Sequence, residues 1–202
     1  AAASAATIDL INDLSQAYEF TDINAMTTSA TVFLLGKRLK TGQGVWVVNS
    51  TNGLDIAGGL KAAPLNGVFM NDCGAKGDSL YRDNSTGLWY VDVGLTVASS
   101  DDTAAFILAM ASTGGTDSKG TINFGEGGYY IAPESIDADG IDIRQKTLKG
   151  LGYETSNIVQ SGNNTYQTFF RNNPRNLSEA GAWGSGGKYR IHDIAIRGNW
   201  DG

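Results

Sequence analysis

The 202-residue sequence has few of the side chains that build metal sites and nucleophile sites. Its single cysteine, Cys73, excludes an intrachain disulfide framework and a zinc site made of cysteines. Its single histidine, His192, excludes a site with several histidine ligands and argues against a histidine-based catalytic triad. We therefore expect no metal ion and no cofactor.

Two further shortages concern membranes and nucleic acids. No apolar run approaches the roughly 18 residues that a membrane-spanning helix needs. The formal net charge is −6, and no cluster of basic residues offsets it, which argues against nucleic acid as the main partner. We expect neither membrane nor nucleic acid among the partners. With 41% hydrophobic and 18% charged residues, the composition is that of an ordinary folded protein.

Glycine and aspartate are abundant. Glycine accounts for 27 of the 202 residues, whereas its average share is about 7%. Aspartate outnumbers glutamate by 16 to 5. Both residues favour turns, because glycine accepts positive φ and aspartate side chains bond to nearby backbone. Many turns predict β structure with short strands. The sequence begins at Ala1 rather than at a methionine, and we expect it to be a piece of a longer protein.

Residues 1–20 have the spacing of an amphipathic helix. Small residues fill positions 1–6, and apolar residues then recur at three- and four-residue intervals, namely Leu10, Ile11, Leu14, Ala17 and Tyr18. A helix this short is marginal alone and needs a partner. That partner is either its own domain or further copies of the same helix, and the residues leave both interpretations open.

Residues 21–66 have the pattern of a small β domain. Residues 31–35 and 45–48 are β-prone runs, and the glycine-containing residues 41–44 form a turn before the second run. Residues 67–132 continue with a short strand at 68–70, a glycine-rich loop at 72–78 and a helix at about 100–113. Strands follow at 120–124 and 127–131. The chain is therefore expected to remain mainly β.

The expected helix at about 100–113 carries the signals of a helix start. Ser99 and Asp102 have the spacing of a capping box, and Asp101 and Asp102 would face the positive end of the helix dipole. Phe106 and Met110, with Thr103 and Ile107, are expected on one apolar face. Paired aspartates could instead bind a cation or perform acid–base chemistry. Their position at a helix start favours the structural interpretation.

Residues 133–202 are expected to form short strands separated by turns. Residues 141–143 and 191–197 alternate, and residues 147–152 are a strand that ends in a glycine corner. Alternation along 191–197 places His192 and Asp193 on opposite faces, so they are not expected to act together. Steps near 24 residues between such strands would suit a coiled β-solenoid.

Taken together, these segments resemble the beginning of right-handed parallel β-helices of the pectate-lyase-like superfamily, bacteriophage tailspikes in particular. The resemblance covers about residues 35–202. It is carried by D-C-G-A-K-G-D at 72–78, D-D-T-A-A at 101–105, G-T-I-N-F at 120–124, G-Y-Y-I at 128–131, and the segments 148–152 and 194–199. Two departures are an insertion at residues 80–98, which we interpret as a hairpin, and Cys73 where the family often has an aromatic residue.

The resemblance implies a fold class and a domain order. The chain would be mainly β, with an N-terminal neck helix over 1–20, a small β domain over 21–66 and the capped start of a right-handed parallel β-helix over 67–202. The capping residues would be Ser99, Asp101, Asp102, Phe106 and Met110. It also implies a homotrimer in which the neck helices meet through Leu10, Ile11, Leu14 and Tyr18.

The function implied is that of the N-terminal, virion-anchoring and trimerising part of a phage tailspike. The partners would be a phage tail or baseplate protein and, for the full-length form, a host surface polysaccharide that it binds and depolymerises. The alternatives are a secreted, extracellular polysaccharide lyase or glycoside hydrolase of this fold, and a non-catalytic carbohydrate-binding module.

Catalysis on a sugar would need a suitable pair of acidic side chains. A glycoside hydrolase needs two carboxylates roughly 5–10 Å apart. The candidates form no recognisable motif, and they are Glu126, Asp137, Asp139, Asp142, Glu154 and Asp193. We therefore expect this segment to be structural, and we assign no catalytic residue in it.

Overall fold

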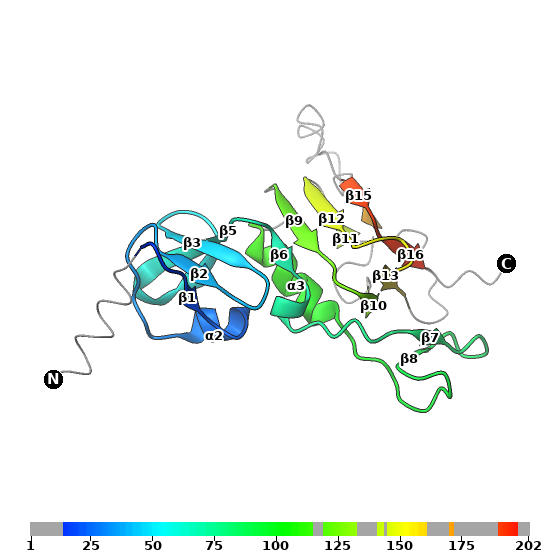
Figure 1. Ribbon diagram of the computed structural model, residues 1–202. Coiled ribbons are helices and arrows are strands. Elements are labelled where there is room, and N and C mark those ends of the chain that lie inside the picture. The colour runs from blue at the N-terminus through cyan, green and yellow to red at the C-terminus, as the bar shows by residue number, and fades with distance from the viewer. Residues whose placement is uncertain are drawn as a thin grey trace.

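The computed structural model describes residues 14–114, 119–132, 141–143, 145–160, 170–171 and 190–197. Within these residues the fold is mainly β, with 16% helix and 35% strand, and it has several sheets, none of them closed. A β unit formed by the N-terminal part of the chain lies beside a set of stacked parallel strands formed by the rest (Figure 1). We call the first the N-terminal β unit and the second the parallel stack.

The N-terminal β unit is a five-stranded sheet in the order β1-β2-β3-β5-β4. Strands β1 and β2 are parallel, and the other pairs are antiparallel. The helix α2 packs against it, begun by Asp22, whose carboxylate accepts a hydrogen bond from the Ala25 N–H at 2.7 Å. The elements are β1 Tyr18–Glu19, α2 Ile23–Thr28, β2 Arg38–Lys40, β3 Val45–Asn49, β4 Leu54–Ile56, the 3₁₀ turn η1 Ala57–Gly59 and β5 Leu60–Pro64.

Strand β3 shows why this unit folds as a one-sided sheet. Its side chains alternate, with Trp46 and Val48 buried and their neighbours half-buried, as expected when one face is covered. The strand predicted over 45–48 and the turn at 41–44 are confirmed. The strand suggested by the β-prone residues 31–35 is wrong, because β1 already occupies the edge of β2. Only Phe33 of that segment is buried, against the rings of Tyr18 and Phe20.

The neck helix predicted over 1–20 is wrong at its C-terminal end. Residues 14–20 form a turn followed by β1, in which Tyr18 pairs with Leu39. Tyr18 also packs on Phe20, with ring centroids 5.1 Å apart, so cross-strand and aromatic contacts override the helical spacing. Leu14 is exposed. Residues 1–13, with Leu10 and Ile11, lie outside the described residues.

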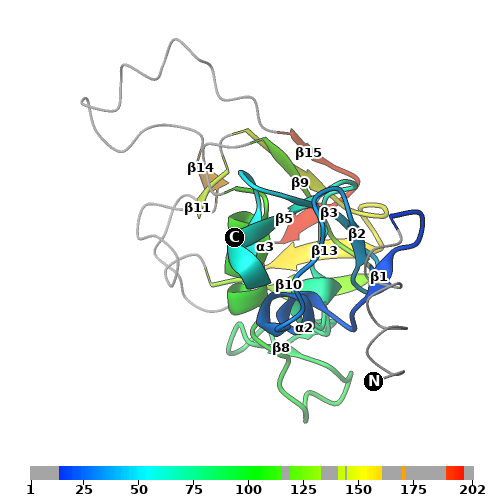
Figure 2. The same ribbon diagram turned by 90° about the vertical axis from the view of Figure 1, so that its left-hand side faces the viewer.

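The parallel stack is made of three sheets whose strands all run parallel. The first has the order β15-β12-β9-β6, the second β10-β13-β16 and the third β11-β14. Seen along the stack, β9 and β15 lie on one side, β10 and β13 on a second, and β11 and β14 on a third (Figure 2). The strands are β6 Val68–Phe69, β9 Gly120–Asn123, β10 Gly127–Tyr130, β11 Ile141–Asp142, β12 Lys146–Lys149, β13 Ser156–Val159, β14 Phe170–Arg171, β15 Arg190–His192 and β16 Ala195–Arg197.

Apolar side chains of the same register stack on one another within each sheet. Ile122 pairs with Val68 on one side and with Leu148 on the other, and all three are fully buried. Tyr129 and Ile158 repeat this in the second sheet. The strands predicted at 68–70, 120–124, 127–131 and 147–152 are therefore confirmed, with ends that differ by one to three residues.

The single alternating strand predicted over 191–197 is wrong. Asp193 has φ 56°, a left-handed conformation that breaks the extended chain. The segment therefore splits into β15 and β16, which belong to different sheets. As a result Leu148 pairs with Ile191, while Ile196 pairs with Ile158, so the expected regular step between the 148 and 196 strands does not hold.

The inserted residues 80–98 form the predicted hairpin. Its strands are β7 Tyr81–Arg82 and β8 Trp89–Tyr90, paired antiparallel. The hairpin projects along one side of the parallel stack (Figure 1). Trp89 anchors it, because its buried ring donates from Nε1 to the Gln160 carbonyl oxygen at 3.0 Å.

Helix α3 Thr103–Ser112 lies at the end of the parallel stack that faces the N-terminal β unit (Figure 1). It contacts β6 and the 3₁₀ turn η2 Asn71–Cys73. The helix predicted at about 100–113 is confirmed, and Phe106 is fully buried near Phe124. Met110 is half-buried. Ile107 is 45% exposed, against prediction, because Ala105 and Ala109 take the inner face of a helix that is apolar on most sides.

The close packing of β10 against the chain leading into the hairpin can be tested at Gly128. A Cβ added there would lie 1.9 Å from the Ser79 carbonyl oxygen. We expect Gly128→Ala to lower the free energy of unfolding by about 1–3 kcal/mol, because the backbone must move apart. Urea unfolding followed by circular dichroism measures this. Gly94→Ala, in an exposed turn, is the control and should change stability by less than about 0.5 kcal/mol. Equal effects would contradict the packing described.

Candidate functional site

A buried carboxylate joins the N-terminal β unit to the parallel stack. Asp72, in η2, is only 6% exposed. Its side chain accepts hydrogen bonds from the Thr41 hydroxyl at 2.8 Å, the Gly44 N–H at 2.7 Å and the Gln43 N–H at 3.0 Å. Thr41 Oγ1 in turn accepts a hydrogen bond from Trp46 Nε1 at 2.9 Å. We call this set the Asp72 joint.

Within the described part of the chain, the Asp72 joint satisfies a buried carboxylate with neutral donors. A buried carboxylate is costly unless it is hydrogen-bonded, and three donors in a tight hairpin turn meet this requirement. Glycine is needed in that turn, because a Cβ on Gly42 would lie 2.6 Å from Asp72 Oδ1 and one on Gly44 would lie 2.9 Å from Asp72 Oδ2. The β2–β3 turn is thereby fixed against the first turn of the parallel stack.

A second group of carboxylates holds the loop at 72–78 against the start of α3. The Asp102 side chain accepts hydrogen bonds from the Lys76 N–H at 2.8 Å and the Gly77 N–H at 3.2 Å. Asp78 acts in the opposite direction and accepts from the Ser100 N–H and hydroxyl at 2.8 and 2.9 Å. The two segments therefore brace one another, and these aspartates are structural.

The capping box predicted for Ser99 and Asp102 is wrong. Asp102 stands at the N-cap position, but its side chain makes no capping hydrogen bond because it is turned toward the loop. Ser99 donates its N–H to the Trp89 carbonyl oxygen of the hairpin instead. Asp101 does serve the helix start, since its carboxylate accepts a hydrogen bond from the Thr103 N–H at 2.8 Å.

Burial raises the pKa of two groups at the contact between the loop at 72–78 and the start of α3. Burial raises the pKa of Asp102 to about 6, the hydrogen bonds from Lys76 and Gly77 oppose the rise, and the charges of Asp78 and Asp101 add to it. Burial also raises the pKa of Cys73 to about 12, with a smaller contribution from the Asp72 charge. Cys73 is therefore a thiol at neutral pH and a poor nucleophile.

The remaining carboxylates predicted as catalytic candidates do not all lie together. Glu126 and Glu154 are exposed and line the same small hollow beside the hairpin. Asp193 and His192 do meet, with Oδ2 and Nδ1 2.8 Å apart, because the left-handed Asp193 brings the two side chains together, so the prediction that they point apart is wrong. Asp137 and Asp139, and the side chain of Asp142, lie outside the described residues. Within the described part of the chain, no group of three or more His, Cys, Asp or Glu side chains could hold a metal ion.

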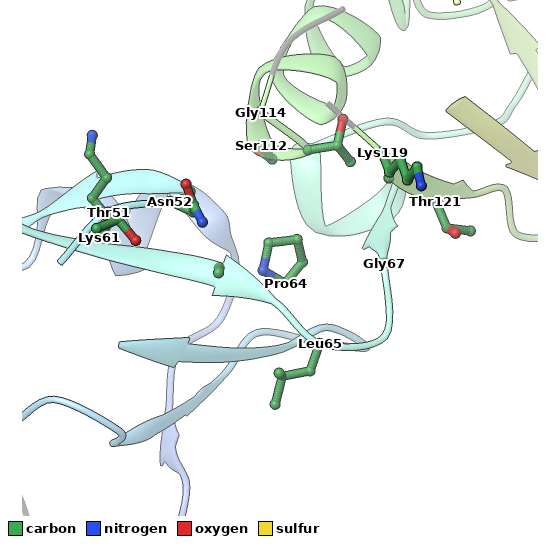
Figure 3. A pocket seen from close by; sticks show the side chains of 14 residues that line it. Thr51, Asn52, Lys61, Pro64, Leu65, Gly67, Ser112, Gly114, Lys119 and Thr121 are labelled. Carbon is green, nitrogen blue, oxygen red and sulfur yellow. The ribbon is translucent and has the colours of Figure 1, made fainter. Parts of the chain in front are cut away.

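A larger cleft of about 650 Å³ separates the N-terminal β unit from the end of α3. Figure 3 shows Thr51, Asn52 and Lys61 on one side and Ser112, Lys119 and Thr121 on the other. Two of its hydroxyls are already used, because Ser112 donates to the Leu108 carbonyl oxygen and Thr113 to that of Met110. Lys61 pairs with Asp55 at 2.7 Å. These three side chains of the cleft therefore already have partners within the fold.

Sequence reasoning did not find Asp72 or Asp78. The Asp72 partners lie 28 to 31 residues away and the Asp78 partner lies 22 residues away. The only local signal is their place in a glycine-rich loop, which is also typical of an ordinary turn. Ser79 and Asn157, which line the small hollow, have no sequence signal.

Comparison with known proteins places the chain in no family. The sequence matches no protein-family model and no curated protein, and the structure matches no solved structure. Among the described helices, none has the length and apolar character needed to cross a bilayer.

The Asp72 joint predicts a large effect of removing one side chain. We expect Asp72→Ala to lower the free energy of unfolding by about 3 kcal/mol, because three donors then lose their acceptor. Asp55→Ala is the matched control and should cost no more than about 1 kcal/mol, because the Asp55 side chain is 87% exposed in its ion pair. Guanidinium unfolding of the three proteins decides this. Similar losses in both variants would contradict the joint.

The raised pKa of Asp102 predicts a pH dependence of stability. In the unfolded chain an aspartate titrates near 3.9, so between about pH 4 and 6 only the folded protein holds this proton. The contribution of Asp102 to stability therefore decreases as pH rises from about 4 to about 6 and is constant above. We expect Asp102→Asn to remove this decrease, as measured by urea unfolding at intervals across the range. Parallel curves for wild type and variant would contradict it, and Asp55→Asn serves as the control.

Proposed function

We propose that this chain is the N-terminal part of a trimeric bacteriophage tailspike. It would anchor the spike to the phage tail or baseplate and carry the first turns of a right-handed parallel β-helix. The longer form would bind and depolymerise a host surface polysaccharide. The proposal rests on the sequence resemblance, and the order in which the parallel strands pair is the structural observation that supports it best.

The strand order has the repeat that a β-helix requires. The chain passes through β9, β10 and β11, then β12, β13 and β14, then β15 and β16. Each strand pairs in parallel with its counterpart in the next group, such as β9 with β12 and β10 with β13. In a solenoid, each turn contributes one strand to each sheet and contacts only its neighbours. The described pairs follow this rule.

Helix α3 has the position expected of an N-terminal cap. An open sheet edge and an uncovered apolar end both invite unwanted association. Phe106 fills the core at that end beside Phe124, and the Asp102 and Asp78 braces hold the helix start in place. This supports the assignment of Asp101, Asp102, Phe106 and Met110 to a cap, with Asp102 acting through the loop rather than through the helix N–H groups.

The Asp72 joint suits a part that transmits force between an anchor and a binding domain. A phage spike must hold its polysaccharide-binding region in a fixed orientation on the virion. The joint ties the N-terminal β unit to the parallel stack through three donors on one buried carboxylate. We place the depolymerising chemistry elsewhere in the longer protein, because the buried carboxylates Asp72 and Asp102 already serve structural hydrogen bonds.

Assembly into trimers is tested by the mass in solution. We expect light scattering of this chain to give about three times the 21.3 kDa chain mass, through contacts of residues 1–13. The double variant Leu10→Asp, Ile11→Asp should dissociate, because charges at a helix contact are not tolerated. The double variant Asn12→Asp, Gln16→Glu adds the same charge outside the apolar stripe of the sequence and is the control. A monomer at every concentration would contradict the proposal and favour a secreted enzyme or a carbohydrate-binding module.

A further inference from the structure

A small hollow lies between the hairpin β7–β8 and the sheet β10-β13-β16. Its volume is about 310 Å³. One wall comes from the hairpin and the chain leading into it, and the other comes from the ends of the parallel strands. The polar and aromatic residues that line it are Ser79, Trp89, Glu126, Glu154, Thr155, Asn157 and Arg197. We call it the hairpin groove.

Two buried polar atoms of the hairpin groove have no hydrogen-bond partner within the described part of the chain. They are Ser79 Oγ and Asn157 Oδ1. Ser79 is only 2% exposed, so its hydroxyl is cut off from bulk water. Buried polar atoms are rarely left without a partner, because the loss of hydration is then uncompensated.

The adjacent serine shows that the lack of hydrogen-bond partners is local to the groove. Ser156 lies next to Asn157 in β13 and is fully buried. Its hydroxyl donates to the Gly125 carbonyl oxygen at 2.7 Å and accepts from the Leu151 N–H at 2.9 Å. The fold therefore supplies hydrogen-bond partners to the Ser156 hydroxyl. Ser79 Oγ and Asn157 Oδ1 have none among the described residues and can bind a ligand.

The groove also holds three charged groups that the fold does not use. The side chains of Glu126, Glu154 and Arg197 make no hydrogen bond or ion pair to any residue that the structure describes. The two carboxylates and Asn157 Oδ1 are acceptors, whereas the guanidinium is a donor and the Ser79 hydroxyl can be either. The set has more acceptors than donors and a net charge of −1.

The walls of the groove are held rigid before any ligand arrives. The Trp89 indole is fixed by its hydrogen bond to the Gln160 carbonyl oxygen at 3.0 Å. Ser79 donates its N–H to the Gly128 carbonyl oxygen at 2.9 Å, which fixes the other side. A rigid site loses little conformational freedom when it binds a ligand.

We propose that the hairpin groove binds a single sugar ring, and an amino sugar in preference to an acidic one. The volume is at the lower end of the range for small-molecule sites, about 300–1,000 Å³, which fits one ring. Each sugar hydroxyl is both donor and acceptor, so a ring can satisfy Ser79 Oγ and Asn157 Oδ1 together. An amino group pairs with Glu126 or Glu154, whereas a uronate carboxylate would meet two carboxylates and only one guanidinium, that of Arg197.

The choice of a sugar rather than another polyol rests on the proposed function. The location of the site rests only on the residues of the hairpin groove. The hairpin groove is assigned binding alone, and no step of bond cleavage is placed on its residues. The inserted hairpin supplies one wall, so this site depends on residues 80–98, where the sequence departs from the pattern that it otherwise resembles.

The experiment titrates the full chain with four methyl glycosides, followed by saturation-transfer NMR. The probes are methyl glucosaminide, methyl N-acetylglucosaminide, methyl glucoside and methyl glucuronide. We expect saturable binding with glucosaminide strongest and glucuronide about tenfold weaker or absent. Failure of all four probes to bind, or a preference for glucuronide, would overturn the proposal.

Two groove variants and one control locate the binding. Glu126→Gln with Glu154→Gln should weaken glucosaminide binding about tenfold, because each loses a charge-assisted contact. Ser79→Ala should weaken binding without lowering the urea midpoint, because its hydroxyl has no hydrogen-bond partner among the described residues. Glu19→Gln, on the distant β1, is the charge control and should bind like wild type. Binding that survives all the groove variants would lie elsewhere and would overturn the assignment.

The outcome is separable from that of the proposed function. A trimer that binds none of the sugars would contradict the groove assignment and leave the spike proposal standing. A monomer whose sugar binding depends on Ser79 and the two glutamates would support the groove and contradict the trimeric spike.

Discussion

The arrangement of this protein depends on one buried carboxylate. Asp72 stands at the first turn of the parallel stack, yet all of its partners belong to the hairpin turn of the N-terminal β unit. A charge in that position must be hydrogen-bonded or the fold loses more than it gains by burying it. The donors exist only when the β2–β3 turn is folded and docked. The joint therefore links the folding of one unit to the position of the other, and the loop that follows Asp72 passes the constraint on to α3 through Asp102.

The sequence allowed much of the fold to be predicted where the signals are local. Short β-prone runs bounded by glycine predicted β3, β6, β9, β10 and β12, and the helix α3 followed from an aspartate pair before an apolar run. Other features have no local signal. Strand β13 has no alternation of apolar and polar residues, although glycines stand on both sides of it in the sequence. Asp193 takes a left-handed conformation without being glycine. Helix α3 is apolar on most sides, so its buried face is set by what it packs against.

The candidate sites were harder to predict than the fold, because only the folded chain brings their residues together. The Asp72 joint, the Asp102 brace and the hairpin groove each join residues far apart in sequence, and each depends on atoms whose neighbours are known only in three dimensions. Asp101 and Asp102 were recognised as structural, but the partner of Asp102 was wrong because a backbone N–H in a distant loop binds it more closely than its own helix does. A buried atom with no partner, such as Ser79 Oγ, cannot be seen in a sequence at all.

The central claim is that the N-terminal β unit and the parallel stack form one cooperative body. Native-state hydrogen exchange tests it directly by comparing the Val48 N–H, bonded to the Lys37 carbonyl oxygen, with the Phe124 N–H, bonded to that of Lys149. The account predicts that both amides exchange through the same global opening, with the same free energy and the same dependence on denaturant. A separate, lower-energy opening that exposes Val48 while Phe124 stays protected would contradict it.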